Sequence, residues 1–105
     1  MTNCDLALIG AKLIDAKGMY IVPGYVCMHA HGGGGHDFNE CTEEAFRAAI
    51  KAHQKHGATS IFPTLSSSPF SEIRKAVTVC ETLMNEKDSP VLGVACRRPL
   101  SESEK

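Results

Sequence analysis

The sequence P-G-Y-V-C-M-H-A-H-G-G-G-G-H-D, from Pro23 to Asp37, places two histidines between a short apolar run and four consecutive glycines. Residues i and i+2 of a strand project to the same face, so we expect His29 and His31 to project together from the end of a strand. Two neutral imidazoles side by side are a natural half-site for a divalent metal ion. The glycines allow the backbone to turn sharply or to approach a ligand closely, because glycine adopts positive φ without a clash at Cβ.

Other interpretations of these histidines stay open at this point. Two histidines on a strand can simply be polar residues of a solvated face, although the apolar run before them and the glycine loop after them favour the metal site. A catalytic zinc typically has three protein ligands and an open position, so the pair is not a complete site. Alternatively, Cys27, His29, His31 and Cys41 could form a small structural zinc site, since Cys27 shares the predicted strand face with both histidines.

Length and composition narrow the class of protein. The 105 residues suffice for one small domain, and a net charge of -1 gives no indication of nucleic-acid or membrane-surface binding. No apolar run approaches the roughly 20 residues of a membrane span. The N-terminus lacks the basic patch and long apolar region of a signal peptide, so we expect a cytoplasmic location. The five cysteines include no C-x-x-C pair and are expected to be free thiols, with Cys80 packed as a small apolar residue.

Short strands and helices alternate along the chain. The sequence predicts strands at Leu6–Ile9, Lys12–Ile14 and Met19–Val22, with a tight turn over Asp15–Gly18, before the histidine strand. A helix follows from Thr42 to His56, with Thr42 as N-cap, acidic residues in the first turn and Gly57 after the end. His53 and His56 are expected to be structural residues of that helix and not ligands.

The second half of the chain repeats this alternation. Ala58–Thr64 is predicted to be a strand, and Pro63 fits its end or a sheet edge better than a strand centre. The serines at 66–68 are expected to form a loop in which Ser68 caps the next helix; a phosphate-binding role is the alternative. That helix is predicted over Pro69–Asn85, with the apolar stripe Ile73, Ala76, Val77, Cys80, Leu83 and Met84. A third strand is predicted at Val91–Cys96. The order indicates an α/β fold with a parallel sheet.

The block P-G-Y-V-C-M-H-A-H-G-G-G-G-H-D-F (Pro23 to Phe38) resembles the first barrel strand of the amidohydrolase superfamily, and more narrowly that of N-acetylglucosamine-6-phosphate deacetylases. H-G-A-T-S-I-F-P-T (His56 to Thr64) resembles the second barrel strand of the same family, and Leu13 to Val22 resembles the linker from its small N-terminal β-domain. The resemblance implies a partial (β/α)8 barrel. Residues 1–23 would be a remnant of the β-domain, residues 24–96 the first three strands and two helices, and residues 97–105 a disordered tail.

The resemblance also implies a function. The family hydrolyses the N-acetyl amide of N-acetylglucosamine 6-phosphate to glucosamine 6-phosphate and acetate, so the expected partner is a small amino-sugar phosphate and the expected cofactor is a divalent metal ion such as zinc. Catalytic residues of such barrels lie at the carboxyl ends of strands, where His29 and His31 are expected. In two-metal members of the family these two positions ligate one of the ions.

The sequence departs from the family pattern in three places. The family carries Asp two residues before the first histidine, where this chain has Cys27, and a thiol does not reproduce a carboxylate at neutral pH. The family's third strand leads to a metal-binding Glu, where this chain has Arg97, and a guanidinium does not bind cations. The later barrel strands, with further ligands and a catalytic Asp, have no counterpart before Lys105.

Two hypotheses for the function follow. The first is a metal-dependent deacetylase by descent that is inactive as this chain alone. The second is a non-catalytic truncated fragment with at most a weak His-x-His metal site or an interaction role. A barrel needs about 250 residues, so the parallel strands are expected to expose unpaired edges and to favour self-association.

Overall fold

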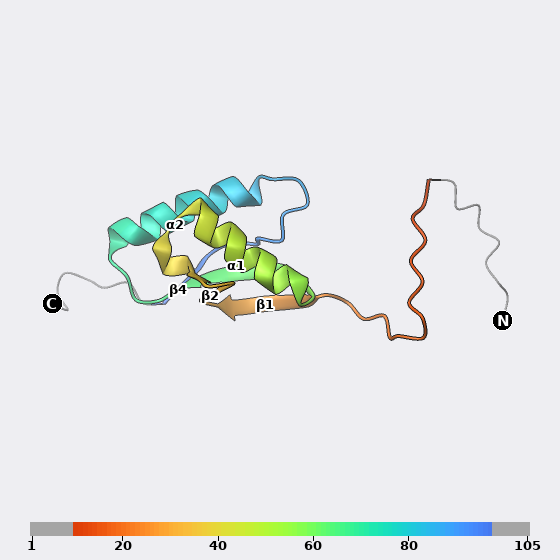
Figure 1. Cartoon of the computed structure of the whole chain (residues 1–105). Helices are drawn as coiled ribbons and strands as arrows, with labels where there is room; N and C mark the ends of the chain where they lie inside the picture. Colours follow the sequence, from red (N-terminus) through yellow and green to blue (C-terminus); the bar gives the residue numbers. More distant parts are fainter. Residues whose placement is uncertain (1–9, 98–105) are drawn as a thin grey trace.

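A computed structural model describes residues 10–97 of the chain. Three parallel strands form one sheet, two helices pack against it, and a short hairpin and a 3-10 turn lie between the first strand and the first helix (Figure 1). The elements are β1 (Tyr25–Ala30), β2 (Gly32–Gly33), β3 (His36–Asp37), η1 (Phe38–Glu40), α1 (Glu43–Lys55), β4 (Ala58–Leu65), α2 (Phe70–Met84) and β5 (Ala95–Cys96). The expected α/β class with parallel strands is thus confirmed.

Local sequence signals fix helix α1. The Thr42 hydroxyl accepts a hydrogen bond from the amide of Ala45 (3.2 Å), which is the expected N-cap. Glu43 and Glu44 lie in the first turn, where negative charge is favourable, and Gly57 follows the end of the helix with φ of 99°. The apolar face carries Phe46, which is fully buried and packs edge-to-face on Phe38 with ring centroids 4.9 Å apart.

Helix α2 buries a narrower stripe than predicted. Ala76, Cys80 and Leu83 are buried, as expected, whereas Val77 and Met84 are about 40% exposed (39% and 43%). Pro69, and not Ser68, occupies the N-cap position and makes no side-chain hydrogen bond. The prediction that Ser68 caps this helix is wrong, because its buried hydroxyl bonds elsewhere.

The sheet has the order β1-β4-β5, and β4 is its central strand. The prediction that Pro63 marks a strand end or edge is therefore wrong. Proline is accommodated because pairing with β1 is irregular between Cys27 and Ala30, while pairing with β5 begins only at Thr64. The predicted strand over Val91–Cys96 is also shorter than expected: Val91 makes one isolated bridge to Ile61, and regular pairing is confined to Ala95–Cys96.

A bulge in β1 decides which way its side chains point. Cys27 pairs with Ile61 and Ala30 pairs with Pro63. Ile61 and Pro63 are two residues apart in β4 and face the same side, so Cys27 and Ala30, three residues apart, also share that side. One extra residue in β1 thus breaks the strict alternation expected from sequence. The side that they share faces the helices, since Ile61 and Ala30 are both buried.

The four glycines form the β2–β3 hairpin, which lies against α1. Gly34 and Gly35 make the turn with φ of 59° and 84°, which confirms the expected sharp turn. A Cβ on Gly33 would lie 3.4 Å from the carbonyl oxygen of Ala49 in α1, and the His53 ring bonds to the carbonyl oxygen of Gly32 (2.9 Å). The close approach that the glycines permit is therefore to a helix.

The segment before β1 contains the expected turn but not the expected strands. The amide of Met19 donates to the carbonyl oxygen of Ala16 (2.9 Å), and Gly18 has φ of 80°. Lys12–Ile14 and Met19–Val22, however, are not strands, because no strand among residues 10–97 pairs with them. In Figure 1 this segment leads away from the helices. The strand predicted at Leu6–Ile9 and the tail beyond Arg97 lie outside the described residues.

Candidate metal site

The two histidines of the H-A-H sequence lie side by side. His29 is the penultimate residue of β1, and His31 follows the strand directly. Their rings meet edge-to-face with centroids 4.8 Å apart, and their Nε2 atoms are 3.1 Å apart. Two nitrogens bound to one tetrahedral zinc at 2.0–2.1 Å are separated by roughly 3.3 Å. The observed spacing therefore fits a shared ion within a few tenths of an ångström.

Both rings lie on the side of the sheet that the helices leave open. Ala30 is buried toward the helices, whereas the neighbouring His29 is exposed, which places its ring on the opposite side. The ring of His31 lies beside it, with the two Nε2 atoms 3.1 Å apart. His29 is exposed and His31 is half-buried. The helices lie above the strands in Figure 1, and the face below β1 is open.

His31 contacts a polar network that connects η1 with the loop after β4. Its Nδ1 lies 3.4 Å from the Ser66 hydroxyl, and the amide of Ser66 donates to the Asn39 side chain (3.0 Å). Asn39 in turn donates to the Ser68 hydroxyl, which donates to the carbonyl oxygen of Ser66 (3.0 Å). These contacts join the carboxyl ends of β1 and β4 into one hydrogen-bonded unit.

Thr64 closes the gap that the bulge leaves in the sheet. Its buried hydroxyl accepts from the amide of Ala30 (3.2 Å) and donates to the carbonyl oxygen of Phe62 (3.1 Å). The side chain thus replaces a backbone ladder bond between the two histidines. This residue holds the backbone from which both rings project.

Sequence reasoning did not identify Asn39, Thr64 or Ser66 as part of this site. One signal was available, because D-F-N-E over Asp37–Glu40 has the capping-box pattern. Asp37 accepts from the amide of Asn39 (2.7 Å), and Glu40 accepts from the amide of Asp37 (2.7 Å), so the box is formed. The bond from Asp37, followed by His36, lowers the pKa of Glu40 below its ordinary value. This turn sets the position of Asn39.

The alternative of a structural zinc site at Cys27, His29, His31 and Cys41 is wrong. The bulge turns Cys27 to the face opposite the histidines, and Cys41 donates to the carbonyl oxygens of Asn39 and Glu72 (3.3 Å each). Across residues 10–97, no group of three or more His, Cys, Asp or Glu side chains is arranged to hold a metal ion. Within these residues, the histidine pair is therefore not joined by a third side chain of these types.

The remaining histidines serve other contacts. His36 pairs with Glu40 (3.3 Å) at the surface, His53 bonds to the hairpin, and His56 is exposed at the end of α1. The structural interpretation of His53 and His56 thus agrees with their positions. The four described cysteines are free thiols, and Cys80 is buried, as predicted.

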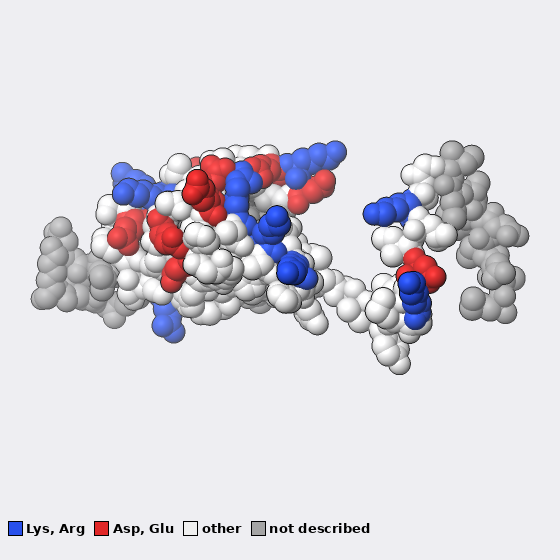
Figure 2. All heavy atoms as spheres, in the orientation of Figure 1, with Lys and Arg blue, Asp and Glu red and all other residues white. Residues whose placement is uncertain are grey.

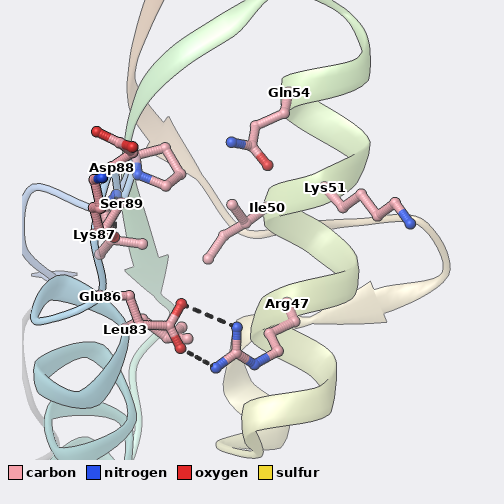
Figure 3. A pocket seen from close by; sticks show the side chains of 11 residues that line it. Arg47, Ile50, Lys51, Gln54, Leu83, Glu86, Lys87, Asp88 and Ser89 are labelled. Carbon is pink, nitrogen blue, oxygen red and sulfur yellow. Dashed lines mark hydrogen bonds and ion pairs between the residues drawn. The ribbon is translucent and has the colours of Figure 1, made fainter.

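A hollow of about 440 Å³ lies at the opposite end of the sheet. It is formed between α1 and the segment leading from α2 into Val91, near the amino ends of the strands (Figure 3). Arg47 crosses its mouth to pair with Glu86 and also bonds Glu43 (2.6 Å). The bond from Arg47 lowers the pKa of Glu86, and the two carboxylates raise the pKa of the guanidinium. The hollow shares no lining residue with the histidine pair.

Charge is mixed over the helical surface. Acidic and basic side chains alternate along the helices in Figure 2, whereas the surface below them, toward β1, is mostly uncharged. Neither helix of the described part has the length and apolar character needed to cross a bilayer.

Comparisons with known proteins agree on one family. No protein-family profile matches the sequence. The N-acetylglucosamine-6-phosphate deacetylase of Haemophilus influenzae is 30% identical over 97 residues, which are 91% of this chain and 26% of that protein. The human protein of the same name is 33% identical over 66 residues, which are 60% of this chain and 16% of that protein.

Solved structures give the same result. The crystal structure of N-acetyl-D-glucosamine-6-phosphate deacetylase from Mycobacterium smegmatis matches with a TM-score of 0.63 and 25% identity, over 72% of this chain and 21% of that one. A mutant of that enzyme in complex with N-acetyl-D-glucosamine-6-phosphate matches with a TM-score of 0.64 and 26% identity, over 74% of this chain and 20% of that one. The chain is therefore related in sequence and in fold to N-acetylglucosamine-6-phosphate deacetylases, over a segment that spans about a quarter of the length of the first curated relatives it matches.

Proposed function

We propose that this chain carries a half-site for one divalent metal ion, of the zinc type, between His29 and His31, and that the half-site belongs to a deacetylase acting on N-acetylglucosamine 6-phosphate. The observation that supports this proposal is the 3.1 Å separation of the two Nε2 atoms at the carboxyl end of β1. Active sites of (β/α)8 barrels lie at that end of the strands. The parallel sheet with helices on one face would be the first part of such a barrel.

The chemistry of amide hydrolysis explains why a metal would be needed. A zinc-type ion polarises the amide carbonyl and lowers the pKa of a bound water. The described residues would contribute the two imidazole ligands and an open face through which substrate can approach. No carboxylate of the described part joins the pair to act as a general base or third ligand. We therefore expect this chain to bind the ion weakly and not to hydrolyse the sugar phosphate by itself.

The substrate assignment rests on the relatives. Curated relatives and solved neighbours bear the name of this deacetylase, and one neighbour was solved with the sugar phosphate bound. In a full barrel, contacts to the sugar and the phosphate would be shared with further strands, on this chain or another.

Metal analysis and an acetate-release assay test the proposal. In equilibrium dialysis, with zinc measured on both sides of the membrane, the purified chain should retain up to one zinc in excess, and the double variant His29→Ala/His31→Ala should retain none. The double variant His36→Ala/His56→Ala is the control and should match the parent. Equal retention by all three proteins would refute the half-site. Acetate release from N-acetylglucosamine 6-phosphate by the purified chain would refute the expectation of an inactive half-site.

A second function, self-association, is favoured by the exposed apolar residues near β1. Tyr20 and Ile21 are 97% and 88% exposed, Met28 is 72% exposed, and β1 is an edge strand whose outer side has no partner strand in the described sheet. Such edges pair readily with other chains. We propose a second copy of this chain as the partner. Sedimentation velocity should show dimers or larger species that Ile21→Asp weakens; a monomer at all concentrations would contradict this proposal.

A further inference from the structure

The hydrogen-bonded unit beside His31 has a second consequence for the histidine pair. A neutral imidazole carries its proton on one nitrogen, and only the other nitrogen can bind a metal. The Nε2 of His31 faces His29, and its Nδ1 faces the Ser66 hydroxyl at 3.4 Å. Metal binding through Nε2 therefore requires that Nδ1 hold the proton. In that tautomer the Nε2 of His31 accepts the hydrogen bond from the Nε2 of His29 (3.1 Å), and the Ser66 oxygen can accept from Nδ1.

Ser66 is held in place by bonds on both sides of its backbone. Its amide donates to Asn39 Oδ1 (3.0 Å), and its carbonyl oxygen accepts from the Ser68 hydroxyl (3.0 Å). The preceding carbonyl, of Leu65, accepts from the amide of Arg97 (3.1 Å). The backbone of Ser66 is thus held on both sides, and its exposed hydroxyl lies beside Nδ1 of His31.

Asn39 is fixed from the other direction. Its amide donates to Asp37 (2.7 Å) within the capping box, and its side-chain nitrogen donates to the buried Ser68 hydroxyl (2.5 Å). The side chain therefore bridges η1 to the loop after β4, two segments that flank His31. Breaking this bridge would release Ser66 without touching either histidine.

We propose that Ser66, held by Asn39, is a positioning residue that fixes the tautomer and ring orientation of His31 so that its Nε2 is available beside His29. The effect of Ser66 on metal binding rests on the proposed half-site, whereas its effect on the tautomer of His31 does not require a metal ion. Partners of this kind orient metal-binding histidines, and their loss typically lowers metal affinity by roughly 10- to 100-fold.

Nitrogen-15 NMR of the metal-free chain tests the tautomer directly. At a pH of about 8, where an ordinary histidine is neutral, long-range proton–nitrogen spectra should show His31 with its proton on Nδ1. In Ser66→Ala the spectrum should change to the Nε2-protonated form or a mixture, and Ser66→Thr should restore the parent signal. Ser67→Ala is the matched control, since Ser67 is an exposed neighbouring hydroxyl, and it should leave the spectrum unchanged. Asn39→Asp keeps an oxygen that accepts from the Ser66 amide but loses the nitrogen that donates to the Ser68 hydroxyl. This variant should therefore show a mixture of the two His31 tautomers.

Zinc titration of the same proteins separates the two proposals. Ser66→Ala should weaken zinc binding roughly tenfold, with Ser66→Thr and Ser67→Ala close to the parent. An unchanged tautomer in Ser66→Ala would overturn the positioning role whatever the zinc result. If Ser66→Ala changes the tautomer of His31 but the parent chain binds no zinc, the positioning of His31 is supported and the half-site is refuted.

Discussion

Replacing Gly32 by alanine tests how the end of β1 is anchored. A Cβ at this position would lie 2.1 Å from the carbonyl oxygen of His36 and 2.8 Å from Cα of Asp37, and both are backbone atoms. Non-bonded carbon atoms are about 3.5 Å apart at their optimum, so the two strands of the hairpin would have to separate by roughly 1 Å. That movement would also pull the carbonyl oxygen of Gly32 away from the His53 ring, with which it makes a 2.9 Å bond.

The cost can be estimated from these two effects. Overpacking of this kind typically costs about 1–3 kcal/mol, and a lost hydrogen bond costs about 0.5–1.5 kcal/mol. We expect Gly32→Ala to lower the free energy of unfolding by about 2–4 kcal/mol, which is a large share of the usual stability of about 5–15 kcal/mol for a folded domain. In urea, with a slope of about 2 kcal/mol per molar, the midpoint should fall by about 1–2 M.

The matched control is the next glycine. A Cβ at Gly33 would meet its nearest atoms only at 3.4 Å, which is ordinary contact, and Gly33 does not have positive φ. Gly33→Ala should therefore change stability by less than about 1 kcal/mol, because the alanine also restricts the unfolded chain. Urea unfolding followed by circular dichroism measures both variants. Equal midpoints for Gly32→Ala, Gly33→Ala and the parent would refute the packing described for the hairpin.

Three further predictions follow from the same structure. Phe46→Ala removes a fully buried ring that packs edge-to-face on Phe38 and should lower the free energy of unfolding by about 3–5 kcal/mol, measured by thermal unfolding. A loss below about 1 kcal/mol would contradict the central place of Phe46 in the core. Burial, with a smaller contribution from Cys96, raises the pKa of Cys80 to about 12. Iodoacetamide should therefore modify the exposed Cys96 in the native chain, and Cys80 only after unfolding. Peptide mapping of the modified chain measures both reactions. The bond from Arg47 lowers the pKa of Glu86, so this ion pair stabilises the fold above the pKa that Glu86 has in the unfolded chain, and the stabilisation is lost as pH falls through the pKa in the folded chain. Glu86→Gln should therefore lower Tm slightly near neutral pH and leave it unchanged in acid. A difference in Tm between variant and parent that grows in acid would contradict this ion pair.

Features fixed by neighbours in sequence were predictable. Helix α1 has its cap, its charged first turn, its apolar face and its terminal glycine within one short stretch, and it forms as expected. The turn before Gly18 and the glycine turn at Gly34 likewise depend on single residues that accept positive φ. The strand and helix order, which follows from alternating apolar patterns, led correctly to a parallel α/β sheet.

Features fixed by distant partners were not predictable. The bulge in β1 arises from pairing with β4, more than 30 residues away, and it overturned the expected place of Cys27. Pro63 lies in a central strand because that same irregular pairing tolerates a missing amide. Asn39 and Ser66 meet across 27 residues, and no local pattern indicates their contact. The strands expected before β1 failed for the same reason, since strand propensity without a partner strand does not make a sheet.

X-ray absorption at the zinc edge of the loaded chain tests the central claim most directly. If His29 and His31 share one ion, the spectrum will show two imidazole nitrogens at about 2.0–2.1 Å, with oxygen ligands making up the remainder. The double variant His29→Ala/His31→Ala should lose both imidazoles, and His36→Ala/His56→Ala should keep them. A spectrum without imidazole, or one that the first double variant leaves unchanged, would contradict the account.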